Sequence, residues 1–124
     1  MIDESTWHRV PNAQKRFVWT ATADGIRLHH TNENASYVIT WEIFHAILEQ
    51  ARNMAATQNG IITAGIHQSD PTPGSIGEWV LAQRFVIETG NVTPRHLSFL
   101  GPIFGRMGFI RRQISGNSIQ WVFN

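Results

Sequence analysis

Alternating hydrophobic and polar positions dominate the first third of the chain. Residues 17–22, FVWTAT, are rich in β-formers and place their larger side chains on one side. Asp24-Gly25 is a turn signal, and the alternation resumes over residues 26–30. We therefore expect an antiparallel hairpin, preceded by an irregular arm over residues 1–14 and followed by a short third strand at residues 37–39.

A helical period replaces the alternation at residue 41. Thr40 is a suitable N-cap and Asn59-Gly60 is a stop signal, so the pattern predicts a helix over residues 41–57. Its apolar positions form one stripe at the helical spacing. The stripe consists of Trp41, Phe44, Ile47, Leu48, Ala51 and Met54, of which we expect Trp41, Phe44, Leu48 and Ala51 to be buried. The apolar run over residues 61–66 predicts a buried strand.

The stretch HQSDPTPG, residues 67–74, has no apolar period and is typical of a linker. After it, Ser75 and Glu78 have the spacing of a capping box, and we expect a mostly buried helix that ends at Gly90. Two strand-like runs around the turn SGNS predict a hairpin at the end of the sequence. The expected fold is α+β. A hairpin and long helix occupy residues 1–66, and a second unit over residues 75–124 shares their core.

The segment TPRHLSFLGPIFGRMG, residues 93–108, begins and ends like a helix but has Gly101 and Pro102 in its middle. Proline inside a helix costs about 3 kcal/mol and glycine about 1 kcal/mol. We therefore expect the helix to break at Leu100-Gly101, with Gly101 free to take a left-handed conformation and Pro102 starting a second short helix. The alternative is one kinked helix, which would pack against protein rather than DNA.

Charge is distributed unevenly, although the net charge is only +1. Up to Glu88 the chain has six Lys/Arg and nine Asp/Glu, and after it four Arg and no acidic residue. A change of sign along a chain indicates that the basic part contacts an anion. The absence of cysteine excludes disulfides and Cys-based zinc sites. We expect no secretory signal and no membrane span, and a cytoplasmic location.

The order of elements after residue 74, with "TPRHLSFLG", "GRMGFIRR" and "GNSIQWVF", resembles a winged-helix module, a helix-turn-helix variant with a β-hairpin wing. The resemblance covers residues 75–124, and residues 1–74 resemble no family. It implies that the last helix enters the major groove and that the wing contacts the DNA backbone. The basic residues in this region are the expected DNA-binding set: Arg95, His96, Arg106, Arg111 and Arg112.

Two histidine patterns could hold a metal. Glu42, His45 and Glu49 could share one face of the long helix, but no second ligand pair repeats the pattern. His29-His30 with Asn32 and Asn34 is similar to the His-Asn-His pattern of some nucleases, yet adjacent residues of a strand point to opposite faces. We therefore expect neither metal nor cofactor.

The sequence predicts a small non-enzymatic DNA-binding protein, such as a regulator or an accessory factor of a phage or mobile element. The sequence contains neither a nucleophile elbow nor a phosphate-binding glycine loop, which are motifs that would indicate catalysis. The alternative is a protein-interaction module or inhibitor, whose partner is another protein or a second copy of the chain. A small hydrolase with histidines in a cleft is the third and weakest hypothesis.

Overall fold

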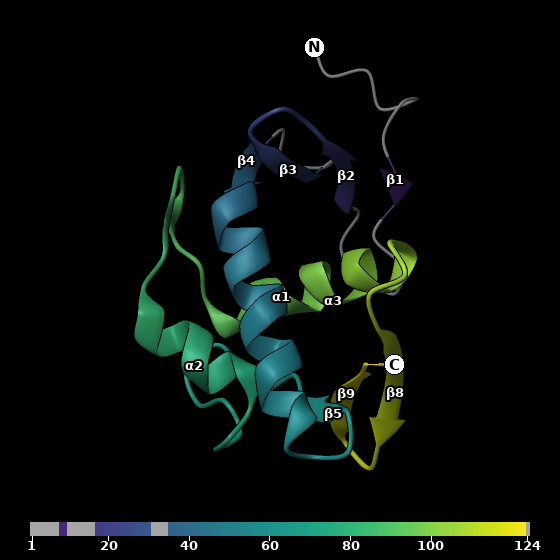
Figure 1. Cartoon of the computed structure of the whole chain (residues 1–124). Helices are drawn as coiled ribbons and strands as arrows, with labels where there is room; N and C mark the ends of the chain where they lie inside the picture. Colours follow the sequence, from purple (N-terminus) through teal and green to yellow (C-terminus); the bar gives the residue numbers. More distant parts are fainter. Residues whose placement is uncertain (1–7, 10–16, 31–34, 124) are drawn as a thin grey trace.

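The computed structural model describes residues 8–9, 17–30 and 35–123. Within these residues, three α-helices and a 3-10 turn are interspersed with nine short strands (Figure 1). The helices are α1 Trp41–Ala56, α2 Ile76–Gln83 and α3 Leu97–Arg106, and the 3-10 turn is η2 Pro94–His96. The strands are β1 His8–Arg9, β2 Phe17–Ala21, β3 Gly25–His30, β4 Ala35–Thr40, β5 Ile61–Thr63, β6 Val86–Ile87, β7 Gly90–Asn91, β8 Arg111–Ser115 and β9 Ser118–Val122.

The N-terminal sheet is an antiparallel meander in the order β1-β2-β3-β4. The Thr22 hydroxyl supports the β2–β3 turn, because it accepts hydrogen bonds from the backbone N–H groups of Asp24 and Gly25, both at 3.2 Å. The predicted hairpin followed by a helix is confirmed, and so is the α+β class. The third strand is longer than expected, since β4 spans all of Ala35–Thr40 and pairs with β3 along its whole length. The arm expected at residues 1–14 lies mostly outside the described residues.

Helix α1 begins and ends where its sequence signals predict. The Thr40 hydroxyl accepts a hydrogen bond from the Ile43 N–H at 3.3 Å, and Asn59 follows the helix in a left-handed conformation. The buried positions include Phe44, Leu48 and Ala51, as expected. Trp41, which was expected to be buried, is only half-buried, and its indole N–H donates to the Thr22 carbonyl, 2.9 Å away.

Helix α2 is shorter than the sequence indicated. Ser75 is the N-cap as predicted, with its hydroxyl accepting from the Glu78 N–H at 3.2 Å, but the Glu78 carboxylate accepts from the Gly74 N–H at 3.1 Å and not from Ser75, so the capping box is only half formed. The helix ends at Gln83 because Arg84 takes a left-handed conformation, with φ of 54°. The residues that follow form the small β6–β7 hairpin instead of further helical turns, so the predicted extension to Gly90 is wrong.

The second large sheet joins parts of the chain that are far apart in sequence. Its order is β5-β9-β8, and all its neighbours are antiparallel. β5, which follows α1, therefore pairs with the final strand of the chain. A two-residue turn closes the β8–β9 hairpin, with Gly116 at φ of 61°, as expected when glycine occupies the first turn position.

One hydrophobic core extends from the N-terminal sheet through α1 to α2, α3 and β9. In Figure 1, α1 runs from the N-terminal sheet at the top to β5 and β9 at the bottom, and α3 passes behind it. Phe44 of α1 packs edge-on against Phe104 of α3, with ring centroids 4.9 Å apart. Among the described residues, no helix has the length and apolar character that crossing a membrane requires.

Candidate macromolecular interface

The segment that contains Gly101 and Pro102 forms one helix, so the predicted break at Leu100-Gly101 is wrong. Turn η2 leads directly into α3, and Pro102 lies inside the helix. Burial offsets the cost of this arrangement, which is about 3 kcal/mol for proline and 1 kcal/mol for glycine. Each large apolar side chain that leaves water contributes about 1.5–3 kcal/mol. Four such residues of α3 are at most 1% exposed, namely Leu97, Leu100, Ile103 and Phe104.

Gly101 allows the helix to approach the indole of Trp121. A Cβ atom at residue 101 would lie 2.9 Å from the Trp121 Nε1 atom, closer than real Cβ contacts. Glycine also relieves the clash between the Pro102 ring and the preceding side chain. Gly101 is helical and does not have positive φ, so the left-handed conformation that glycine allows is not used here. Close packing, not backbone freedom, explains glycine at this position.

Helix α3 is covered on two sides. On one side its Phe104 ring contacts the Trp121 ring of β9, with centroids 5.5 Å apart. On another side Phe99 packs against Phe17 of the N-terminal sheet, with centroids 4.2 Å apart. The residues between Ser98 and Arg106 have no polar side chain. The helix that the winged-helix resemblance would place in the major groove is therefore apolar and largely enclosed.

Arg95 and His96 lie in η2, immediately before α3. Arg95 is exposed. His96 is half-buried beside Tyr37 of β4, with the two rings edge-on and 5.5 Å apart. Its Nδ1 atom accepts a hydrogen bond from the Thr93 N–H at 2.9 Å, which completes a capping box at the start of the turn. Burial lowers the pKa of His96, so at neutral pH its ring is uncharged and organises the backbone.

We predict that His96 makes folding stability dependent on pH. Its pKa in the folded protein lies below the ordinary 6.5, so the unfolded chain binds the proton more tightly. The stability due to neutral His96 is present above about pH 6.5 and is lost as the pH falls through the lowered folded value. His96→Asn keeps an acceptor for Thr93 but does not titrate, and we expect the variant to lose less stability on acidification. Urea unfolding at pH 8 and pH 5 measures this difference, and equal losses in both proteins would contradict it.

The other three arginines lie at or beyond the far end of α3. Arg106 ends the helix, and Arg111 and Arg112 begin β8. Arg106 and Arg111 are exposed, whereas Arg112 is half-buried. Arg95 and Arg106 are eleven residues apart along the helical segment, so about 16 Å of rise separates them. The fold therefore divides the predicted DNA-binding set between two ends of one helix.

Arg112 has an incompletely satisfied guanidinium. Its Nε atom is buried and, within the described part of the chain, has no hydrogen-bond partner. Burial also lowers the pKa of Arg112 from its ordinary value. A buried donor without an acceptor is unfavourable by about 1–3 kcal/mol, more when it is charged.

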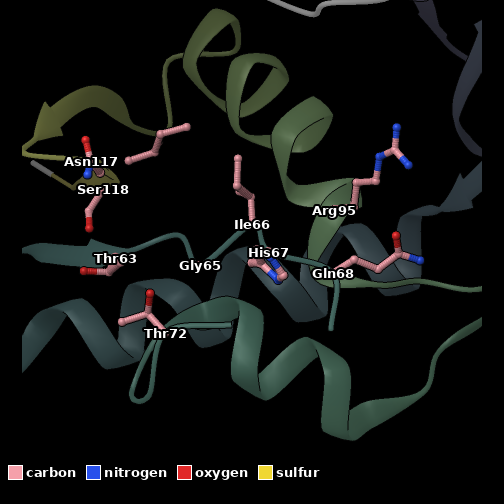
Figure 2. Close-up of a pocket in the computed structure, with 10 residues that line it drawn as sticks. Thr63, Gly65, Ile66, His67, Gln68, Thr72, Arg95, Asn117 and Ser118 are labelled. Carbon is pink, nitrogen blue, oxygen red and sulfur yellow. The ribbon is translucent and has the colours of Figure 1, made fainter. Parts of the chain in front are cut away.

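A shallow pocket of about 480 Å³ adjoins the start of η2. Figure 2 shows Asn117 of the β8–β9 turn and Ser118 at the start of β9 at one end and Arg95 at the other, with the Arg95 guanidinium turned away from Ile66. The lining of the pocket also includes Thr63, His67, Gln68 and Thr72. Its polar groups are therefore hydroxyls, side-chain amides, an imidazole and a guanidinium, and none of the lining residues has a carboxylate. Such a lining can contact an anion, although no buried charge is directed into it.

Three large apolar side chains are exposed among the described residues. Ile114 of β8 and Val86 of β6 are each 76% exposed, and Leu81 of α2 is 39% exposed. Their exposure was not predicted, because the sequence pattern placed Leu81 and Val86 in a mostly buried helix and residue 114 at an ordinary strand position. The sequence did contain one signal for the exposure of Ile114. This residue is apolar at a position of β8 where a solvated hairpin would have a polar side chain.

The two histidine patterns do not form a metal site in the described structure. Glu42, His45 and Glu49 are exposed on α1, and Glu49 forms an ion pair with Arg52 at 3.3 Å. His29 is buried in β3. The side chain of His30, as well as Asn32 and Asn34, lies outside the described residues. No group of three or more metal-binding side chains occurs in the part of the chain that the structure describes.

No protein-family model, curated protein or solved structure matches this chain.

Proposed function

We propose that residues 41–123 form a winged-helix-type unit. The supporting observation is the order of elements α1, β5, α2, α3, β8 and β9, together with the sheet order β5-β9-β8. The terminal hairpin corresponds to the wing, and β5 is the strand that anchors it. On this proposal α1 and β5 belong to the same unit as the C-terminal hairpin, and residues 67–74 are its internal loop rather than a linker between units.

We propose that this unit is a protein-interaction module. The observation that carries the proposal is the covering of α3. A helix that reads bases must enter the major groove with polar side chains that contact base edges. Here α3 packs against Trp121 and against Phe17 through Phe99, and its middle has no hydrogen-bonding side chain. An exposed strand carrying Ile114 offers a more suitable contact surface, with a protein as partner.

Contact with a nucleic-acid backbone is the second candidate function. It is favoured by the carboxylate-free pocket beside Arg95 and by the exposed Arg106 and Arg111. Phosphate contacts need cations and N–H donors but no base-reading helix. In this function the protein would bind duplexes without sequence preference.

We further propose that the protein is not an enzyme, needs no metal or cofactor and acts in the cytoplasm. The argument for the first two points is chemical. The pocket lining lacks a carboxylate, and His96 uses its Nδ1 atom as a backbone acceptor rather than as a catalytic base. For the location, a chain without cysteine forms no disulfide and so does not need an oxidising compartment.

Selection of bound sequences from a pool of random duplexes, combined with a salt titration, tests these proposals. We expect no consensus sequence, and binding no tighter than about 10⁻⁶ M at physiological salt, as for non-specific association. A consensus bound with a dissociation constant near 10⁻⁸ M or below would refute the protein-interaction proposal in favour of DNA reading. The positive result is a partner protein, cross-linked in source cells, that binds the purified chain at a fixed stoichiometry after nuclease treatment.

The backbone-contact function makes a separate prediction for the arginines. If Arg95 or Arg106 contacts a phosphate, its replacement by alanine should reduce the salt slope of duplex binding by about one unit. Arg52→Ala is the matched control, because Arg52 is exposed on α1 and is already paired with Glu49. Salt slopes that are unchanged in both test variants would exclude this candidate.

A further inference from the structure

The outer edge of β8 has no neighbouring strand within the described structure. β8 is the last strand in the order β5-β9-β8. Natural proteins protect such edges with proline, lysine, bulges or covering segments, because unpaired N–H and C=O groups bind other strands. The five residues of β8, RRQIS, contain neither proline nor lysine, and Ile114 is 76% exposed.

Backbone hydrogen bonds identify which residues of β8 face outward. On β9, the Ile119 carbonyl accepts from Ala64 at 2.9 Å and the Phe123 N–H donates to Gly60 at 2.8 Å, so these alternate residues bond toward β5. The intervening residues of β9 therefore bond toward β8, where their partners are Ser115, Gln113 and Arg111. The backbone groups of the remaining two residues, Arg112 and Ile114, are directed to the open edge.

Arg112 and Ile114 also share one face of the sheet, because side chains two apart in a strand point the same way. An added strand would therefore meet a cation and an apolar side chain in alternate positions. Arg112 is half-buried and its guanidinium has no carboxylate partner among the described residues, and a carboxylate accepts from an arginine fork more strongly than a neutral group does. Arg111 adds a second cation on the opposite face, and β8 has no acidic residue.

We infer that β8 binds an extended acidic peptide of a partner protein by strand addition, with a carboxylate at Arg112 and an apolar residue two positions away at Ile114. This inference rests on the proposed protein-interaction function and specifies its surface. A second copy of the chain is a poorer occupant. Pairing two β8 strands would bring the Arg111 and Arg112 residues of both copies onto one ribbon without any compensating carboxylate.

The test uses the full chain and a fluorescent peptide with blocked ends, in which every second residue is in turn glutamate and valine and the residues between them are threonine, so that glutamate and valine share one face of the strand. We expect saturable binding, measured by anisotropy, that weakens with added salt. The same peptide methylated at alternate backbone nitrogens, or with lysine for glutamate, should bind at least about tenfold more weakly, because strand addition depends on main-chain hydrogen bonds and here also on charge. Equal binding of the methylated peptide would overturn the inference without any change to the protein.

Variants of the chain localise the binding. Ile114→Pro removes an outward N–H at a position where an edge strand tolerates proline, and we expect at least about a tenfold loss of affinity. Ile114→Ala keeps the N–H and should lose less affinity than Ile114→Pro. Arg112→Gln should abolish the preference for the glutamate peptide over the lysine peptide. Thermal melts establish whether each variant is folded. If Ile114→Pro does not fold, the comparison of the methylated and unmethylated peptides on the wild-type protein decides whether binding is by strand addition.

The outcomes separate this inference from the proposed function. If the cross-linked partner binds wild type and Ile114→Pro equally, the β8 assignment is wrong but the protein-interaction function stands. If wild type binds neither partner nor peptide, both fail. A concentration-dependent dimer that Ile114→Pro abolishes would assign the edge to a second copy and overturn the acidic-peptide inference.

Discussion

Phe44→Ala is expected to lower the free energy of unfolding by about 3–5 kcal/mol, the range for aromatic residues removed from a packed core. Phe44 is 1% exposed on α1. Its ring contacts the rings of Trp41, Phe104 and Phe109, with centroids between 4.9 and 6.4 Å away. The substitution therefore leaves a cavity where α1 meets α3, and the enclosed ring positions allow little collapse.

Denaturant unfolding of the purified variant measures this loss. Phe44→Leu should lower the free energy of unfolding by less, because leucine retains much of the buried volume. Glu42→Ala, on the exposed side of α1, should change the free energy of unfolding by no more than about 0.5 kcal/mol. A loss below about 1 kcal/mol for Phe44→Ala would place the side chain outside the core.

Gly101→Ala is expected to destabilise the protein by about 1–3 kcal/mol, although alanine is the better helix former. The added methyl group would lie 2.9 Å from Trp121 Nε1 and 3.2 Å from its Cε2 atom. The indole is fully buried and cannot move aside freely. The new Cβ would also crowd the ring of Pro102.

Gly105→Ala is the matched control in the same helix. Its nearest non-local atom would be the Ile110 carbonyl oxygen at 3.8 Å, which is ordinary contact. Alanine should therefore be neutral or stabilising by up to about 1 kcal/mol there. The two substitutions are expected to have opposite signs in denaturant unfolding. If Gly101→Ala also stabilises the protein, Trp121 does not restrict the helix.

Local signals in the sequence were sufficient for much of the fold. The alternation in β2 and β3, the Asp24-Gly25 turn and the stripe of α1 depend on neighbouring residues, so the hairpin and helix were predicted correctly. The capping residues Thr40 and Ser75 have the side-chain contacts that their sequence positions indicated.

The candidate site depended more on contacts that are distant in sequence. Arg95, Arg106, Arg111 and Arg112 were identified from their charge, but charge alone could not reveal that α3 separates them. Leu81 and Val86 were assigned to one buried helix because the left-handed turn at Arg84, a residue without a strong preference for that conformation, was not foreseen.

By itself the sequence determined the α+β class and the positions of α1 and of both large hairpins, because periodicity, caps and turns act over a few residues. Only the tertiary structure decided whether Gly101-Pro102 breaks a helix, since the local cost of about 4 kcal/mol is exceeded by burial of α3 between Phe17 and Trp121. It also decided that β5 pairs with β9 and leaves β8 as the open edge. Strand pairing depends on which distant segments meet in one core, and no short stretch of sequence contains that information.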